Sequence, residues 1–487
     1  MPDPPPRALE AQMQAALASR EARLIRRRLP LPSAPASPSA PAPINLTSND
    51  YLSLSTSPAL RSAVLARLTA APSILGAGGS RLLVPSAPHT ALEARLARLL
   101  RAPAALLFNS GFDANAALLA ALPQPRDAVV HDAAVHASTH DGLRLSRLPP
   151  ARRRAFAHND VRALVRVLRA LRREDAALCA GRASVFVCVE SVYSMDGTMA
   201  PLGEIVGAVE AAFPLGNAYV VVDEAHATGV YGPGGRGVVA MLGLEERVFA
   251  RVHTFGKALA ASGGESVAGC SVLFVLRLMC GVAVVLGSEL LKDYLINYAR
   301  PLIYTTSLSH ASIIAADCSF DLLEDGTAEK LAAHLLDLAS HFVDLLRAEL
   351  TSIPPDILAL PAHLQTPFPP SADPDTDTDL LPIPPDPRTY APTPIIPLLT
   401  PHPRPLSAFL AARGIVARPI TWPTVPKGAD RVRVCLHAGL TRAQVARVAR
   451  EAGAWARGVL EERRAEEQRR RRRLRGVAVR GLVESKL

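Results

Sequence analysis

The 487-residue sequence predicts an α/β fold in which a mostly parallel central sheet forms a large domain. Short apolar and β-branched runs alternate with segments of helical spacing between residues 104 and 255, as in a sheet covered by helices on both faces. The length also exceeds that of one typical domain, so a smaller α+β domain is expected to follow. A hydrophobic content of 49% is sufficient for a sizeable core.

The individual elements of the large domain follow from these runs. The strands are predicted at residues 104–108, 128–131, 184–190, 219–223 and 250–255. The helices between them are predicted at residues 92–100, 114–122, 161–173 and 205–213. Because short apolar strands joined by helices are typical of buried parallel sheets, we expect these strands to run in one direction.

Four regions are predicted along the chain. They are an N-terminal helix and Pro-rich linker (1–44), a large domain (45–310), a small domain (311–462) and a basic tail (463–487). Helical spacing covers residues 8–29, and six prolines between 30 and 43 exclude regular structure there. The small domain is expected to contain a long helical pair (311–350), a Pro-rich loop (354–393), strands near 394–399 and 431–434, and a closing helix (442–464).

The net charge of +10 is concentrated near the C-terminus. Arg469–Arg473 and Arg475 supply six of these charges, close to the end of the chain. A basic tail can bind phosphate polymers, but a solvated helix end is the more common reason for such a run, so no nucleic-acid partner is expected. The six cysteines contain no CxxC pair, which favours reduced thiols, and they predict no metal site.

The chain ends predict a compartment. No secretory signal opens the sequence, and the apolar run 271–287 is too short, and interrupted by Arg277, to cross a membrane. The terminal Ser485-Lys486-Leu487 matches a peroxisomal address read by an import receptor. We therefore expect a peroxisomal protein, with the cytoplasm as the alternative and no membrane partner.

An amine and a buried carboxylate are predicted at neighbouring strand ends. The run Val220–Val222 is followed by Asp223, and the strand at 250–255 is followed by Lys257. In open α/β sheets the carboxyl ends of the strands form the ligand-binding edge. Pyridoxal phosphate (PLP) enzymes need a lysine to bond the cofactor and an acid to keep its ring nitrogen protonated. A lone lysine after a strand is usually a solvated group, so other motifs must decide.

Eight segments, two of which contain Asp223 and Lys257, point in the same direction. They are Thr47–Leu52, Gly78–Arg81, His89 with Glu93, Phe108–Asn115, Asp132–Ser138, Glu190–Gly197 and Asp223–Gly229, followed by Thr254–Lys257. In this order they resemble the α-oxoamine synthases, PLP enzymes of fold type I, the aspartate aminotransferase-like fold. The resemblance covers roughly residues 20–460. It implies an acyltransferase of the class I/II aminotransferase group that works as a homodimer.

The resemblance assigns cofactor residues one by one. Ser110, Gly111 and Phe112 open a helix, whose N–H groups also suit a phosphate on physical grounds. The resemblance adds Thr254 to that phosphate group, and Thr305 and Thr306 to the phosphate of the partner subunit. It places His136 on the ring face, and His226 and Ser194 at the ring's phenolic oxygen. Lys257, Asp223, His226 and His136 would be the catalytic set, although a lone strand-end histidine is more often structural.

The substrate residues implied by the resemblance are Arg26, Asn49, Thr424 and Arg433. Arg433 would bind the amino acid carboxylate as a fork, with Asn49 nearby, and Thr424 would line the acyl site. Arg26 would reach the acyl substrate, although a solvated basic helix face explains it equally well. The closest branch of the family joins L-alanine to pimeloyl-CoA in biotin synthesis. Sister enzymes that use glycine or serine with other acyl-CoAs are the alternative.

One segment departs from the family pattern. Residues 264–282 intervene where the family continues directly from Ser262-Gly263 into a strand like 283–288. We hypothesise a translated retained intron, because the segment begins with Gly-Glu-Ser and its removal restores the family pattern; a genuine loop extension is the alternative. Because it follows Lys257 closely, it could leave a folded but catalytically impaired relative. Ser53 for the usual Gly and Phe112 for a common Tyr are lesser departures.

Overall fold

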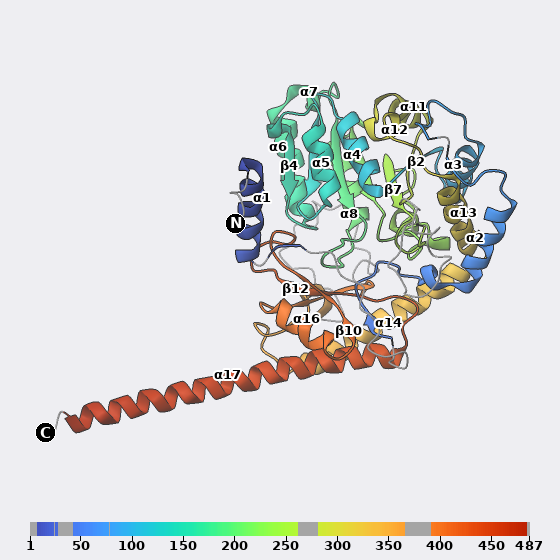
Figure 1. The fold of residues 1–487 in the computed structure, drawn as a ribbon. Coiled ribbons are helices and arrows are strands. Elements are labelled where there is room, and N and C mark those ends of the chain that lie inside the picture. The colour runs from blue at the N-terminus through green and yellow to red at the C-terminus, as the bar shows by residue number, and fades with distance from the viewer. Residues whose placement is uncertain are drawn as a thin grey trace.

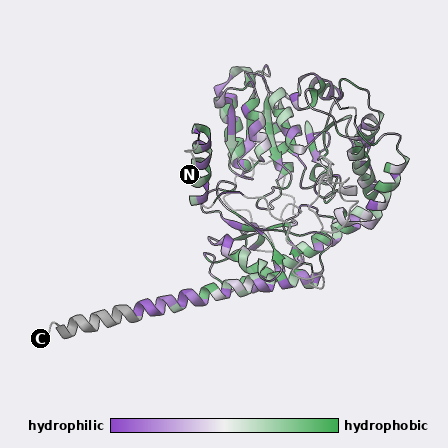
Figure 2. Ribbon diagram, viewed as in Figure 1, coloured by the Kyte–Doolittle hydropathy of each residue, from purple (hydrophilic) through white to green (hydrophobic). Residues whose placement is uncertain are grey.

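The computed structural model describes residues 7–23, 25–27, 42–76, 78–261, 281–365 and 391–484, with side chains up to residue 471. A large α/β domain lies above a smaller domain, and the last helix projects away from both (Figure 1). The strands and helices of the interior are rich in hydrophobic residues, whereas hydrophilic residues dominate the coloured part of the projecting helix where it leaves the small domain (Figure 2).

Seven strands form the central sheet of the large domain. In sheet order they are β2 (Ala104–Phe108), β8 (Ala283–Gly287), β7 (Ala250–Thr254), β6 (Ala218–Asp223), β5 (Val185–Glu190), β3 (Ala128–Asp132) and β4 (Arg153–Phe156). Only β8 runs antiparallel to its neighbours; the remaining pairs are parallel. The predicted mostly parallel sheet is therefore confirmed, and every strand predicted for it is present. The strand β4 was not predicted.

Helices cover this sheet on both faces, so the apolar side chains of the strands are removed from water. They are α2 (Pro58–Ala70), α3 (Ala87–Leu99), α4 (Gly111–Ala121), α5 (Ala137–Leu145), α6 (Val161–Glu174), α7 (Ala176–Cys179), α8 (Leu202–Ala212), α9 (Val238–Met241), α11 (Glu289–Tyr298) and α12 (Arg300–Ile303). The predicted helices are all present, but α3, α4 and α8 begin three to five residues earlier than predicted. In α3 a proline occupies the first turn, where a missing N–H has no cost.

The small domain is built on two short sheets. The antiparallel sheet has the order β11 (Arg418–Ile420), β12 (Arg431–Cys435) and β9 (Ile395–Leu399), and β1 (Ile44–Asn45) pairs in parallel with β10 (Ile415–Val416). Helices α14 (Thr327–Leu350), α15 (Ala362–Gln365), α16 (Pro403–Ala411) and α17 (Arg442–Glu484) complete it. The prediction that residue 45 opens the large domain is corrected here, because the backbone of β1 hydrogen-bonds to the small domain.

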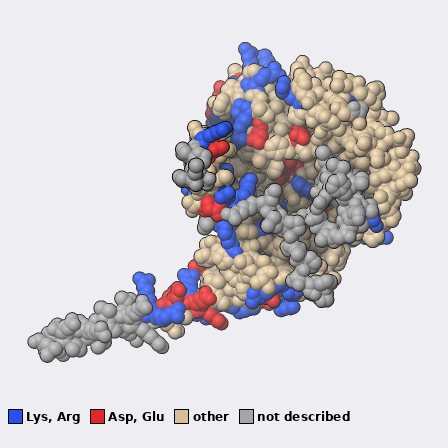
Figure 3. Space-filling model, in the orientation of Figure 1, with Lys and Arg blue, Asp and Glu red and all other residues tan. Residues whose placement is uncertain are grey.

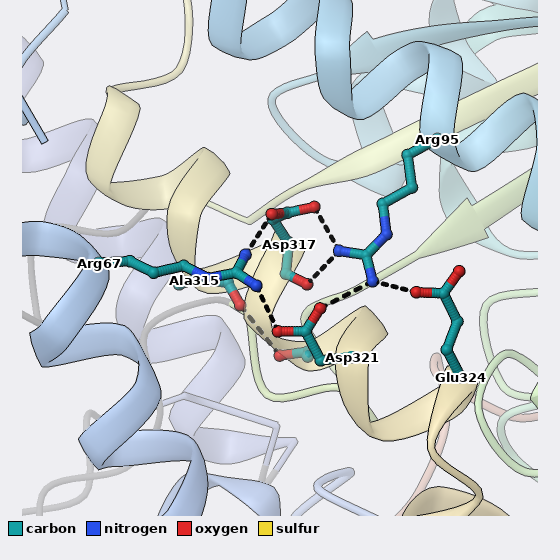
Figure 4. A network of polar contacts seen from close by, with 7 residues as sticks. Arg67, Arg95, Ala315, Asp317, Asp321 and Glu324 are labelled. Atoms are coloured by element: carbon teal, nitrogen blue, oxygen red, sulfur yellow. Dashed lines mark hydrogen bonds and ion pairs between the residues drawn. The ribbon is translucent and has the colours of Figure 1, made fainter. Parts of the chain in front are cut away.

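A network of ion pairs fixes α13 (His310–Glu324) against the large domain. Figure 4 shows Arg67 of α2 and Arg95 of α3 reaching carboxylates on α13. Arg95 lies 2.5 Å from Asp317 and 2.8 Å from Asp321, and Arg67 contacts the same two acids. The first helix of the pair predicted to begin the small domain is therefore attached to the large one.

Both chain ends differ from their predictions. Helix α1 (Ala8–Ala22) ends before residue 29, and it buries none of its side chains, so no packed face extends it. The closing helix was predicted to end at residue 464, but α17 continues to Glu484. Its Glu- and Arg-rich sequence consists of strong helix formers, with an Arg463–Glu467 ion pair of 3.9 Å one turn apart. The predicted end of the closing helix is therefore wrong.

Several predictions fall on residues outside the described part of the chain. These are most of the 264–282 insertion, residues 366–390 of the Pro-rich loop, and the terminal Ser485-Lys486-Leu487. Val282, the last residue of the insertion, is described: it is buried, and its carbonyl accepts a hydrogen bond from the Phe255 amide. Among the described helices, none combines the length and the apolarity that a membrane crossing requires.

Candidate active site

The carboxyl edge of the central sheet gathers the predicted catalytic residues. Glu190 and Asp223 are register partners at the ends of β5 and β6, and Asp223 is also paired with Val252 of β7. The β6 run Val220–Val222 is buried, and Asp223, which ends the strand, is partly buried. Lys257 follows β7 by three residues. The parallel strands thus place two acids and one amine together, as the sequence predicts.

Lys257 contacts His226 directly. The Lys257 Nζ lies 3.0 Å from His226 Nε2. Burial lowers the pKa of Lys257, although Asp223 and Glu190 oppose this effect. Burial, together with the positive charge of Lys257, holds the pKa of His226 well below its usual range. The histidine is therefore neutral, and its Nε2 can accept a hydrogen bond from the lysine amine.

A chain of hydrogen bonds leads from this histidine into the small domain. His226 Nδ1 lies 2.7 Å from the hydroxyl of Tyr51, which donates to Asn49 Oδ1 at 3.3 Å. Arg433 of β12 donates to the same Asn49 oxygen at 3.1 Å. We call Lys257, His226, Tyr51, Asn49 and Arg433 the cross-domain chain. It joins the predicted base to the predicted carboxylate-binding arginine.

A second chain of hydrogen bonds stays within the large domain. Asn115 of α4 donates to Asp223 at 2.6 Å and to Ser138 at 3.2 Å, and Ser138 lies 2.8 Å from His136 Nδ1. The Ala225 amide donates to the other oxygen of Asp223 at 2.8 Å. We call Asp223, Asn115, Ser138 and His136 the large-domain chain. Burial lowers the pKa of His136, so this ring too is neutral and accepts at Nδ1.

Sequence reasoning assigned no role to four residues of this site: Tyr51, Asn115, Ser138 and Glu190. All four lie in the motifs quoted above. Asn115 is one helical turn after Gly111, so its helical spacing could have identified it as a residue on the same face as the phosphate site. Glu190 is buried, and its Oε1 has no hydrogen-bond partner among the described residues. Burial, followed by the neighbouring Asp223, raises the pKa of Glu190 well above its usual range. Burial therefore favours the protonated form of Glu190 beside Asp223.

The residues predicted to hold a phosphate form a suitable cradle. Gly111 approaches Thr254 so closely that a Cβ on Gly111 would lie 2.2 Å from Thr254 Oγ1, so only glycine fits. Thr254 Oγ1 is buried and has no hydrogen-bond partner in the described part of the chain. The first N–H groups of α4 have no partner within the helix. A phosphate would satisfy this hydroxyl and these amides together, so the cradle fits PLP.

Phe112 and His136 lie next to each other above this cradle. The two rings make an edge contact with centroids 6.2 Å apart, and Phe112 is 43% exposed. Ser110 caps α4 and accepts a hydrogen bond from the Asp113 amide at 3.0 Å. The Ser194 carbonyl accepts a hydrogen bond from Arg433 Nε at 2.5 Å, so Ser194 also belongs to this site.

Four predicted residues are joined neither to the phosphate cradle nor to either chain by contacts among the described residues. Asn109 donates to the Thr306 carbonyl at 2.9 Å, while Thr305 and Thr306 lie toward the surface, where a partner subunit could be reached. Arg26 forms an ion pair with Glu21 of α1 at 3.5 Å. Thr424 is exposed in the loop between β11 and β12. The substrate roles of Arg26 and Thr424 stay predictions.

Comparisons with known proteins agree with this geometry. The family model for aminotransferase class I and II matches residues 41–451. An 8-amino-7-oxononanoate synthase from Emericella nidulans is 41% identical over 444 residues, covering 90% of this chain and 94% of the relative. The aminoacyl transferase sphA from Aspergillus fumigatus is 35% identical, covering 82% of this chain and 78% of the relative.

Solved structures give the same fold. A serine palmitoyltransferase with PLP from S. paucimobilis, bound to a myriocin aldimine, has a TM-score of 0.71 at 24% identity and covers 93% of this chain and 99% of the other. An 8-amino-7-oxononanoate synthase from Francisella tularensis has a TM-score of 0.60 at 23% identity, covering 86% and 99%. The predicted PLP fold type I is confirmed.

Proposed function

We propose that this chain, which belongs to the family of class I and II aminotransferases, condenses L-alanine with pimeloyl-CoA to give 8-amino-7-oxononanoate, CoA and CO2. The family is PLP-dependent, and the relatives named 8-amino-7-oxononanoate synthase support an acyltransferase of the α-oxoamine synthase type. The observation that carries the proposal is the cross-domain chain, which joins a buried lysine amine to an arginine suited to a carboxylate.

The large-domain residues are suited to hold the cofactor. When bound, PLP supplies an aldehyde that bonds amines and a ring that withdraws electrons from the α-carbon. Asp223 would hold the ring nitrogen, with Asn115 orienting its carboxylate at 2.6 Å. Thr254 and the start of α4 would bind the phosphate, and His136 would cover one face of the ring.

The cross-domain chain is suited to bind the amino acid and move its proton. Arg433 can form a fork on the carboxylate of L-alanine, beside Asn49. Burial lowers the pKa of Lys257, so its amine can take the proton of the α-carbon and later return one to the product. A bond then forms between that α-carbon and the thioester carbonyl, CoA leaves as the thiol, and the former alanine carboxylate leaves as CO2.

Substrate pairs test this proposal directly. Purified chain would be assayed with L-alanine, glycine or L-serine against pimeloyl-, acetyl-, succinyl- or palmitoyl-CoA, each with and without residues 264–282. The proposal expects the highest kcat/KM for L-alanine with pimeloyl-CoA. A preference for another pair would favour a different α-oxoamine synthase, which the sphA relatives support as the second candidate. Activity only in the shortened chain would make the insertion inhibitory.

A homodimer is part of this proposal. Exposed apolar side chains cluster between α2 and α3 and near α12, among them Leu75 (68% exposed), Leu83 (75%) and Tyr304 (72%). Figure 3 shows the large-domain surface around these helices as largely free of charged side chains. This supports a second copy as partner, since large exposed apolar patches mark interfaces.

Subunit mixing tests the shared site. We expect a Lys257→Ala chain and a Thr305→Ala/Thr306→Ala chain each to be impaired alone. Co-refolded, they would regain activity, because one site then combines the intact lysine with the partner's intact threonines. Mixed dimers without regained activity would contradict the sharing of residues.

The peroxisomal address is a further proposal. A fluorescent fusion that ends in Ser485-Lys486-Leu487 should enter peroxisomes through the import receptor, and a fusion that lacks these three residues should stay in the cytoplasm. Cytoplasmic fluorescence from both fusions would favour the cytoplasmic alternative.

A further inference from the structure

A histidine outside both hydrogen-bond chains lies between two carboxylates. His158, which follows β4 by two residues, has its Nδ1 2.8 Å from Asp132 and its Nε2 3.2 Å from Asp196. Asp132 ends β3 and is fully buried, whereas Asp196 lies in the turn that follows β5. The imidazole edge also contacts the buried Tyr193 ring, with centroids 4.4 Å apart. One side chain therefore bridges two loops of the site.

The hydrogen bonds around His158 require both ring nitrogens to carry a proton. Nδ1 faces a carboxylate oxygen of Asp132, which can only accept. Nε2 lies 2.8 Å from the Thr198 hydroxyl, which itself donates to Asp196 at 2.9 Å and so must accept from the ring. Although burial opposes a charge, the hydrogen bonds to Asp132 and Asp196 raise the pKa of His158 to about 9. His158 is a cation at neutral pH.

One end of this bridge holds the turn that carries His136. Asp132 accepts hydrogen bonds from the Ala134 amide at 2.8 Å and from the Asn159 amide at 2.8 Å. Ala134 precedes His136 by two residues. The position of the His136 ring, which would cover the cofactor, therefore depends on the position of the Asp132 carboxylate.

The other end holds the loop that meets the small domain. The Ser194 carbonyl accepts from Arg433 at 2.5 Å, and the Met195 carbonyl accepts from Arg431 at 3.1 Å. Gly197 (φ +69°) touches β9, because a Cβ there would lie 1.9 Å from the Ile395 carbonyl. The position of this loop therefore determines the position of the Arg433 guanidinium.

We propose that His158 is a positioning residue that holds the His136 turn and the Ser194–Asp196 loop in register, so that the cofactor face and the amino acid carboxylate site are aligned with each other. It touches neither the cofactor nor the amino acid. The proposal rests on the proposed function for its kinetic consequence, but its structural consequence is independent of the substrate.

The test compares His158→Gln with a matched control, Asp160→Ala. Glutamine is neutral and cannot bridge both acids. Asp160 caps α6 through the Ala163 amide and forms an ion pair with Arg166 at 3.6 Å, and neither contact involves the two loops. In His158→Gln we expect the KM for L-alanine to rise roughly tenfold, as for a lost charged hydrogen bond, with a smaller fall in kcat. In Asp160→Ala we expect lower thermal stability and unchanged KM.

Hydrogen exchange of the cofactor-free protein provides the readout that does not depend on catalysis. Amides of residues 132–138 and 192–199 should exchange faster in His158→Gln than in wild type and in Asp160→Ala. Should His158→Gln fail to fold, Asp196→Asn, which weakens one side of the bridge, should give a smaller change in the same direction. Equal exchange and equal KM in His158→Gln and Asp160→Ala would overturn the proposal. Faster exchange without a change in the KM for L-alanine would leave the positioning role intact and would contradict L-alanine as the substrate.

The pH dependence has a defined sign. The groups that face His158 are Asp132, Asp196, Tyr193 and, from α15, His363; Arg431 also acts on Asp196. Because the folded pKa of about 9 lies above the usual 6.5, stabilisation by the charged ring is complete below about pH 6.5 and is lost as the pH rises through 9. Because the intrinsic rate of amide exchange itself rises with pH, the comparison uses protection factors. The protection factors of the two loops should fall over that range in wild type and stay constant in His158→Gln. A wild-type protection factor that is constant from pH 7 to 10 would contradict a charged bridge.

Discussion

The two hydrogen-bond chains of the site differ in how far apart their members lie in the fold. The large-domain chain takes Asp223, Asn115, Ser138 and His136 from elements that contact one central sheet. The cross-domain chain joins Lys257 and His226 to Arg433 of the small domain, through Tyr51 and Asn49. The large-domain chain therefore lies within one domain, whereas the cross-domain chain exists only when the two domains of the subunit are packed together.

This difference separates two kinds of recognition. Every α-oxoamine synthase needs the same cofactor, and the corresponding residues are fixed by a single rigid sheet. In the proposed reaction Arg433 would hold the amino acid, and the position of Arg433 depends on the Ser194–Asp196 loop and on β12. Substitutions in the small domain should therefore change substrate affinity while leaving the affinity for PLP intact.

The largest expected effect comes from Lys257, where the cross-domain chain meets the cofactor side. Lys257→Ala removes both the covalent attachment of PLP and the base, so we expect kcat to fall on the order of 10⁴-fold or more. Borohydride reduction followed by mass spectrometry should find cofactor attached to wild type and none attached to the variant. A variant that keeps more than a few per cent of wild-type activity would show that another group is the base.

Arg433→Lys should disturb only the substrate side. Lysine keeps the charge but loses the fork and the hydrogen bonds to Asn49 and Ser194, so we expect the KM for L-alanine to rise on the order of 30-fold. The visible absorbance of bound PLP and its dissociation constant should match those of wild type. Loss of PLP together with L-alanine affinity would break the proposed separation between the two chains.

The large-domain side was largely predictable from the sequence, because its signals are local. The apolar β6 run ends at Asp223, β7 precedes Lys257, and parallel strands bring such ends to one edge of the sheet. Gly111 was predicted at a helix start, and its contact with Thr254 follows from the same edge. Periodicity and strand order were enough to place these residues.

The substrate side and the chain ends were less predictable, because their partners are distant in sequence. Tyr51 bonds His226 across 175 positions, and Asn49 bonds Arg433 across 384, so no local pattern reveals either contact. The pairing of β1 with β10 is likewise set by tertiary contact. The closing helix was predicted, but its extension beyond residue 464 was not, although the Glu- and Arg-rich residues there favour a helix.

A matched pair of variants sharpens the comparison. Asn115→Ala removes the amide that orients Asp223, so PLP should bind about fivefold more weakly with little change in the KM for L-alanine. Tyr51→Phe removes the hydroxyl between His226 and Asn49, so the KM for L-alanine should rise about fivefold with unchanged PLP binding. Equal effects of both variants on both affinities would mean that the chains act as one network.

Arg95→Ala should have the smallest effect, because its ion network lies outside both chains. Arg95 neutralises Asp317, Asp321 and Glu324 on α13, and Arg67 remains to pair with two of them. Asp321 and Glu324 are 39% and 49% exposed, so water screens the loss, and we expect about 1 kcal/mol of destabilisation. The thermal shift relative to wild type should shrink as salt is raised, because salt screens exposed charges.

Kinetic measurements on Arg95→Ala show whether the ion network affects only the stability of the protein or also its activity. α13 attaches to the large domain through these ion pairs, but the described contacts of Arg95 reach no residue of either chain. The KM values, kcat and PLP affinity of Arg95→Ala should therefore match those of wild type at 25 °C. A raised KM for L-alanine would instead mean that the packing of α13 determines the position of the small domain. The ion network would then contribute to the cross-domain chain.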